Sequence, residues 1–115
     1  MPKTELEARS KAFALALIEL VERIPKGISG SIIARQLLRS GTSIGANYRE
    51  ANRAESRDDF VHKVNVATKE AAETEYWLEL LHESPLLQVP RKEHLLREAR
   101  EILAILSAIG RKAKG

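Results

Sequence analysis

Arginine supplies every basic residue between positions 28 and 57, and this run is the part of the chain best suited to binding chemistry. The arginines are Arg35, Arg39, Arg49, Arg53 and Arg57. The first four are separated by 4, 10 and 4 positions, so one helix would place them on one face. Guanidinium groups form paired hydrogen bonds with phosphate or carboxylate. The face is therefore a candidate nucleic-acid site. The alternatives are a solvated face or ion pairs with acids of the next helix.

Residue types that support catalysis or metal binding lack the partners they need. Cysteine is absent, which excludes disulfides, cysteine-ligated zinc and thiol catalysis. A two-metal carboxylate site in a bundle needs two Glu-x-x-His motifs, and the chain has one, Glu79 with His82. No serine has a histidine at helical spacing, and no glycine-rich phosphate loop is present. We therefore expect no metal, no cofactor and no enzymatic activity.

Charge is segregated along the chain although the net charge is only +3. Residues 28–57 carry five arginines against two glutamates, and residues 89–115 carry seven basic groups against three acids. Residues 58–88 carry seven acids against two lysines. Two interpretations stay open. The basic segments bind an anionic partner such as RNA or DNA, or acidic and basic faces complement each other within the bundle or between subunits.

Four helices are expected to position these residues, over 4–24, 29–55, 57–83 and 91–110. Thr4 with Glu7 matches a capping box, and Ser56 is a good N-cap. The third helix has the clearest apolar seam, with steps of four and three from Phe60 to Leu81. Short connections make successive helices antiparallel neighbours. The expected fold is all-α, a single domain over 1–115 forming an antiparallel up-down-up-down four-helix bundle.

The second helix is unusual because its middle consists of small residues. Its expected apolar spine is Ile33, Leu37, Ser40, Ile44, Asn47 and Ala51. Gly41 and Gly45 each cost roughly 1 kcal/mol relative to alanine inside a helix. The sequence therefore indicates that a neighbouring element approaches closely there, with a kink near Gly41 as the alternative.

Some large apolar residues fall outside the expected core. They are Leu15, Tyr76, Trp77 and Leu80. A helix that is apolar around most of its circumference needs a second cover. The loop residues Leu86, Leu87 and Val89 can supply it by folding back, or another subunit can. Both alternatives remain open, and the second makes these four residues candidates for an oligomer interface.

Three stretches carry a resemblance to a known family. They are QLLRSGTSIGANYREA at 36–51, SRDDF at 56–60 and EYWLELL at 75–81. Together they resemble the bacterial four helix bundle protein family, which is related to proteins encoded in intervening sequences of 23S ribosomal RNA. Many relatives have Ile-Ala-Glu-Gly where this chain has Tyr48, Arg49, Glu50 and Ala51.

The resemblance implies an antiparallel bundle that assembles into a ring, commonly a homopentamer. A similar ring is the accessory protein of diversity-generating retroelements, where it binds a reverse transcriptase and nucleic acid through a basic surface. No catalytic residues come with the family. We therefore expect a non-enzymatic oligomeric bundle that binds RNA or other nucleic acid. The alternative is a protein-interaction scaffold whose charges serve subunit assembly.

A membrane location is not expected. The longest apolar run, Ala12 to Ile18, is far too short to span a bilayer. The first residues lead directly into charged helical sequence and do not form a secretory signal. A cytoplasmic protein is therefore expected.

Overall fold

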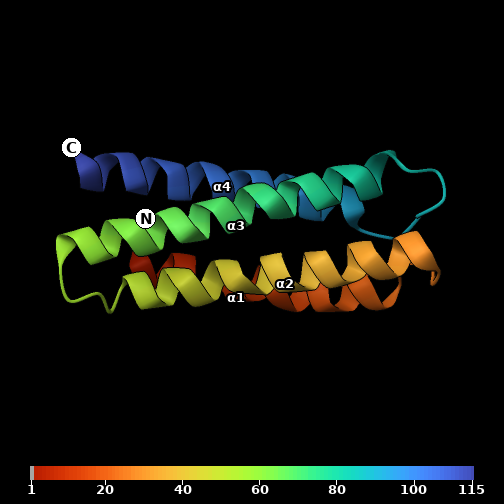
Figure 1. The fold of residues 1–115 in the computed structure, drawn as a ribbon, viewed down its shortest axis with the longest axis horizontal. Helices are drawn as coiled ribbons and strands as arrows, with labels where there is room; N and C mark the ends of the chain where they lie inside the picture. Colours follow the sequence, from red (N-terminus) through yellow and green to blue (C-terminus); the bar gives the residue numbers. More distant parts are fainter. Residues whose placement is uncertain (1) are drawn as a thin grey trace.

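The structure is a computed structural model that describes residues 2–115. Four helices follow one another: α1 (Lys3–Glu22), α2 (Ile28–Ala51), α3 (Arg57–Glu83) and α4 (Lys92–Lys114). They run alternately up and down, with α1 and α2 in one layer and α3 and α4 in the other (Figure 1). Each helix packs against two neighbours, in the order α1, α2, α3, α4 and back to α1. No strand occurs within residues 2–115, so the expected all-α four-helix bundle is confirmed.

Local signals account for the ends of α3 but not for every helix end. The Ser56 side chain accepts a hydrogen bond from the Asp59 N–H at 3.0 Å, and α3 ends just before Ser84 and Pro85. At α1, however, the N-cap is Pro2 and makes no side-chain capping bond, so the expected capping box at Thr4 is wrong. Thr4 lies inside the helix instead, because α1 already begins at Lys3.

The other boundaries differ from expectation at α2 and α4. Helix α2 ends at Ala51, four residues before the expected end. After it, Arg53 and Ala54 donate to carbonyls three residues back, which tightens the chain into a turn. Helix α4 runs past Gly110 to Lys114, because the residues after the glycine, Arg-Lys-Ala-Lys, are good helix formers.

Small residues bring α2 close to α1. An added Cβ at Gly41 would lie 2.0 Å from Cδ2 of Leu17, and one at Gly45 would lie 3.0 Å from Oγ of Ser10. Helix α2 passes both glycines without a break, so the close approach expected from the sequence is confirmed. This close packing of α2 on α1 leaves Leu17 fully buried.

The contact between α2 and α3 contains a buried polar pair. The Ser40 and Thr74 hydroxyls lie 2.8 Å apart at the helix interface, and neither is exposed.

One core position on α2 differs from the expected spine. Tyr48 occupies the core with 3% of its surface exposed. Asn47, the expected spine residue, is only half-buried and donates to the Ser43 carbonyl. The larger apolar ring takes the inward position because it buries more surface.

Arg9 joins α1 to α4 through an ion pair whose contribution to stability depends on pH. Its guanidinium donates two bonds of 2.8 Å to the Glu98 carboxylate, and this pairing lowers the pKa of Glu98. A lowered folded-state pKa adds stability above the unfolded-state pKa, and that stability is lost as pH falls. We expect Arg9→Met to destabilise the fold by roughly 1–3 kcal/mol at pH 7 and by less at pH 3, measured by urea unfolding.

A matched change at the more exposed partner tests whether the pairing with Glu98 is the one that matters. Glu101 also accepts a bond from Arg9, at 3.0 Å, but its side chain is 64% exposed. We expect Glu101→Gln to change stability by less than about 1 kcal/mol. If Arg9→Met costs the same at both pH values, the Glu98 pairing is not the source of its stability.

Candidate nucleic-acid interface

The middle of the arginine face on α2 is occupied by ion pairs. Arg39 pairs with Glu73 and lies 3.4 Å from a carboxylate oxygen of Glu70, both on α3. Bonds from the Trp77 indole and from Arg39 lower the pKa of Glu73. This arrangement is the pairing with acids of the following helix that the sequence left open. At Arg39 the structure therefore favours that alternative over a free phosphate contact.

The remaining arginines of this face have different surroundings. Arg49 lies 3.9 Å from Glu7, and the Arg57 Nε donates to the Ala113 carbonyl at 2.7 Å. Arg35 and Arg53 are exposed, and neither forms an ion pair within residues 2–115. Arg53 also lies in the turn beyond the end of α2. The five arginines therefore do not form one continuous free surface.

A second basic surface lies between α3 and α4. No acid occurs in residues 60–69 or in residues 102–115. The two segments lie side by side, because Gly110 faces Asn65 and Val64, and Arg57 bonds Ala113. A shallow groove between them is lined by His62, Asn65, Val66, Thr68, Lys69 and Lys114. We call these six residues the basic groove.

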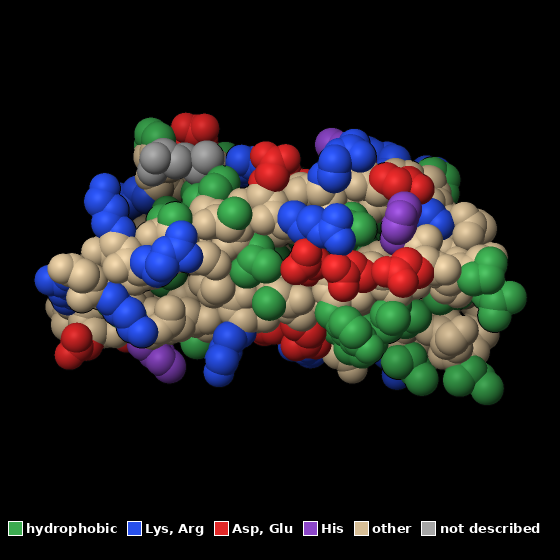
Figure 2. All heavy atoms as spheres, turned by 90° about the horizontal axis from the view of Figure 1, so that it is seen from above, with side chains coloured by type: hydrophobic (Ala, Val, Ile, Leu, Met, Phe, Trp, Pro, Cys, Tyr) green, Lys and Arg blue, Asp and Glu red, His purple; other side chains and the backbone are tan. Residues whose placement is uncertain are grey.

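The cations of this surface are available to a ligand. Within residues 2–115, neither Lys69 nor Lys114 forms an ion pair, and the same holds for Arg111 and Lys112. Lys63 is different, since it lies within 3.8 Å of Glu50 and within 3.7 Å of Asp59. Figure 2, which looks onto α3 and α4, shows lysine and arginine side chains over the half of this face where α4 ends.

Acidic residues concentrate at the other half of the same face. Glu75 and Glu79 accept bonds of 2.8 and 3.0 Å from Arg100, so positive charge is neutralised there. Figure 2 shows the largest cluster of acidic side chains in this half. The charge segregation seen along the sequence thus becomes a division between the two ends of one face.

The net charge of residues 58–88 gives no sign of the basic groove. That segment is acidic as a whole, but its acids occur at 58 and 59 and then only from Glu70 onward. An acid-free run of ten residues holding two lysines and a histidine was the available signal. Its partner, the basic end of the chain, is about 40 residues away, so only the fold shows that the two segments adjoin.

The candidate metal ligands do not assemble into a site. Glu79 pairs with Arg100, and His82 Nδ1 lies 3.6 Å from Glu93. Among residues 2–115 no group of three or more metal-ligating side chains comes together.

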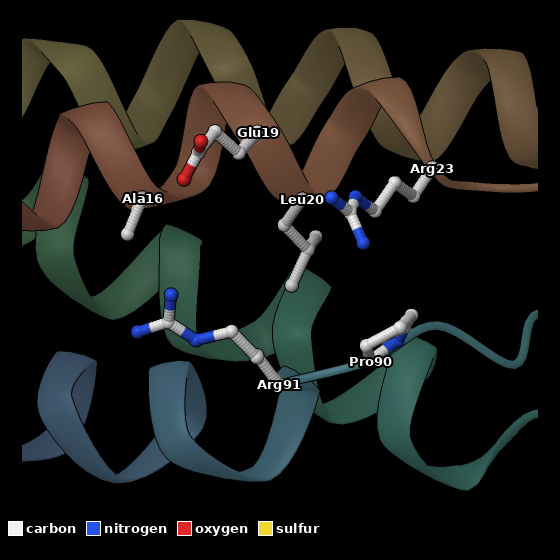
Figure 3. Close-up of a pocket in the computed structure, with 6 residues that line it drawn as sticks. All are labelled: Ala16, Glu19, Leu20, Arg23, Pro90 and Arg91. Atoms are coloured by element: carbon white, nitrogen blue, oxygen red, sulfur yellow. The ribbon is translucent and has the colours of Figure 1, made fainter.

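A more enclosed hollow of about 80 Å³ lies between the end of α1 and the start of α4. Figure 3 shows the guanidinium groups of Arg23 and Arg91 there, with the Glu19 carboxylate beside them and Leu20 between them. The hollow is small, and its glutamate offsets part of the positive charge. It therefore offers less to a polymeric anion than the basic groove does.

The expected interface residues lie at the surface to different degrees. Leu15 and Tyr76 are more than half exposed, Leu80 is 37% exposed, and Trp77 is half-buried with its Nε1 donating to Glu73. Leu87 and Val89 fold back into the core, so the loop covers part of this end of the bundle. Tyr76 and Leu80 nevertheless remain uncovered, and Figure 2 shows apolar side chains gathered at the end of the molecule where α3 ends.

Further exposed apolar residues lie at the same end of the bundle, where α3 ends and α2 begins. Ile28, Ile32 and Leu86 are exposed by 87%, 53% and 78%. On the α1–α2 side, Ile18 and Leu38 are exposed by 43% and 38%. Because Gly41 packs on Leu17 and Gly45 on Ser10 in antiparallel register, Leu38 lies opposite Ile18. The molecule thus has two apolar regions. One consists of Leu15, Ile18 and Leu38 on α1 and α2, and the other of Tyr76, Leu80 and Leu86 at and just beyond the end of α3. Across residues 2–115 no helix has both the length and the apolarity to cross a bilayer.

Comparison with known proteins agrees with the resemblance in the sequence. The family model described as 23S rRNA-intervening sequence protein matches residues 3–108. A solved structure is also similar: a protein of unknown function from the S23 ribosomal protein family of Bacteroides thetaiotaomicron VPI-5482. It is 39% identical with a TM-score of 0.80, and the match covers 96% of this chain and 99% of that one. No curated protein matches significantly.

Proposed function

This chain belongs to the 23S rRNA-intervening sequence protein family, and from that premise we propose that it is a non-enzymatic, homo-oligomeric helical bundle that binds RNA or other nucleic acid through a basic surface. The observation that supports this most is the basic groove, where two acid-free segments adjoin. Arg53 and Arg57 lie at the same end of the bundle, because α2 ends and α3 begins there (Figure 1). Clustered free cations attract a phosphate backbone and release its counterions.

Assembly is the second part of the proposal. The two apolar regions lie on different faces, so one copy would present the end of its α3 to the α1–α2 face of the next. Such a head-to-tail contact repeats around a ring when its rotation closes. A ring, with five subunits as the family resemblance suggests, would repeat the basic groove and raise avidity for a long polyanion.

Removing the two groove lysines tests nucleic-acid binding. We expect Lys69→Ala with Lys114→Ala to flatten the log–log salt dependence of RNA binding by about 1.4, or 0.7 per lost phosphate contact on a single strand. At 0.1 M salt this corresponds to roughly 25-fold weaker binding. Fluorescence anisotropy with a labelled RNA over a salt series measures both quantities.

The control removes the same charge elsewhere. Lys11 and Lys26 are exposed and lie outside the groove, so Lys11→Ala with Lys26→Ala should weaken binding much less. Equal losses in the two double variants would mean that net charge, and not the groove, determines binding. Wild-type protein that binds no RNA at low salt would contradict the proposed function.

The ion pairs of Arg39 favour one competing function, a scaffold without a nucleic-acid partner. If that function holds, Arg39→Ala with Arg49→Ala should change the melting temperature or oligomer size and leave any RNA binding unaltered. If these arginines also contact phosphate, the same variant should weaken binding to unrelated RNA sequences about equally, because phosphate contacts carry no base information.

A further inference from the structure

We infer that the basic groove binds the backbone of double-stranded RNA, in preference to a single strand or a DNA duplex. This inference rests on the proposed function and specifies its ligand. It follows from what surrounds the two lysines: no phenylalanine, tyrosine or tryptophan lines the groove, His62 is its one ring, and Asn65 and Thr68 add polar side chains.

Single-stranded nucleic acids are usually bound by stacking bases on aromatic side chains, at about 1–3 kcal/mol per base. The five Phe, Tyr and Trp residues of this chain are not placed for that role. Phe13 and Tyr48 are buried in the core, and Phe60 is half-buried on the core seam of α3. Tyr76 and Trp77 stack edge-to-face with each other, seven or more residues beyond Lys69, roughly 10 Å or more along the helix. A single strand in the groove would therefore gain charge contacts but no stacking beyond one base on His62.

A duplex needs no stacking partner because its bases already stack on one another. It presents a dense, rigid array of phosphates, and the groove presents cations on two helices packed against each other. From His62 to Lys69 the basic groove extends seven residues along α3, or roughly 10 Å. A rigid array of charges binds a rigid backbone with less loss of conformational entropy than a flexible one.

The polar residues of the groove provide a contact that distinguishes RNA from DNA. The Thr68 hydroxyl donates to the Val64 carbonyl at 2.8 Å, so its oxygen remains available as an acceptor. Asn65 is exposed, and its Oδ1 lies beside Gly110. The wide minor groove of an A-form duplex displays 2′-hydroxyl donors next to the phosphates. Thr68 and Asn65 can accept from these hydroxyls while Lys69 and Lys114 contact phosphate.

The test compares four labelled probes at one salt concentration: an RNA duplex of about 20 base pairs, each of its strands alone, and the DNA duplex of the same sequence. We expect the RNA duplex to bind at least tenfold more tightly than either strand and several-fold more tightly than the DNA duplex. Single strands binding as well as the duplex would overturn the inference while leaving the proposed function intact. No salt-dependent binding of any probe would instead overturn the proposed function.

A second variant isolates the 2′-hydroxyl contact. Asn65→Ala with Thr68→Val keeps every charge and nearly the same volume at Thr68. We expect it to lower affinity for the RNA duplex to that for the DNA duplex, with DNA binding and the salt slope unchanged. The lysine double variant should weaken both duplexes. Equal loss of RNA and DNA affinity in the Asn65 and Thr68 variant, with an unchanged melting temperature, would contradict the assigned role.

Discussion

Replacing Gly30 with alanine is expected to destabilise the bundle by about 2 kcal/mol, because overpacking costs about 1–3 kcal/mol and the obstacle here is backbone. An added Cβ would lie 1.9 Å from the Pro25 carbonyl oxygen and 3.3 Å from Cγ2 of Ile24. The loop between α1 and α2 would have to move, since a carbonyl cannot rotate away as a side chain can. The better helix propensity of alanine, about 1 kcal/mol, offsets only part of this cost.

Gly110 provides the matched control for this substitution. There an added Cβ would meet Asn65 Oδ1 at 3.4 Å and Val64 Cγ1 at 3.7 Å, which are ordinary contacts. Gly110→Ala should therefore stabilise the protein by about 0.5–1 kcal/mol through helix propensity. Urea unfolding of both variants measures the difference. A Gly30→Ala protein as stable as the Gly110→Ala protein would show that the close contact at Pro25 does not constrain the fold.

Replacing Tyr76 and Leu80 together with glutamate is expected to convert the oligomer to a monomer. Burying such a side chain contributes about 1.5–3 kcal/mol, so losing two weakens each contact by about 3–6 kcal/mol. That loss corresponds to roughly 10²- to 10⁴-fold in the dissociation constant. Both side chains are exposed in the isolated chain, so the substitutions should leave the fold itself intact.

The control introduces the same charge on the same helix. His62 and Asn65 are exposed on α3 but lie more than ten residues before Tyr76, so His62→Glu with Asn65→Glu should leave the oligomer unchanged. Light scattering at micromolar concentration gives the mass of each variant. Wild-type protein measured as a monomer would end the assembly proposal, and an unchanged mass for the Tyr76 and Leu80 variant would place the interface elsewhere.

Local signals in the sequence are sufficient to predict four helices and their bundle, although not every helix end. The apolar seam of α3 from Phe60 to Leu81 repeats at the period of bundle packing, and Ser56 and Pro85 mark its ends. Gly41 and Gly45 indicate a close approach without identifying the neighbouring element, which is α1. These features are predictable because periodicity and capping depend on residues within one or two turns of each other.

Sequence neighbours do not determine which groups a charged side chain contacts in the fold. Arg39 shares a face of α2 with Arg35 and Arg49, yet its partners Glu70 and Glu73 are more than 30 residues away. The basic groove also cannot be recognised from sequence neighbours. Lys69 and Lys114 are far apart in the sequence, and only the packing of α3 against α4 brings their segments together. Spacing along a helix determines which side chains share a face. What that face meets depends on the neighbouring helix, so tertiary structure alone decided which cations are paired and which remain available.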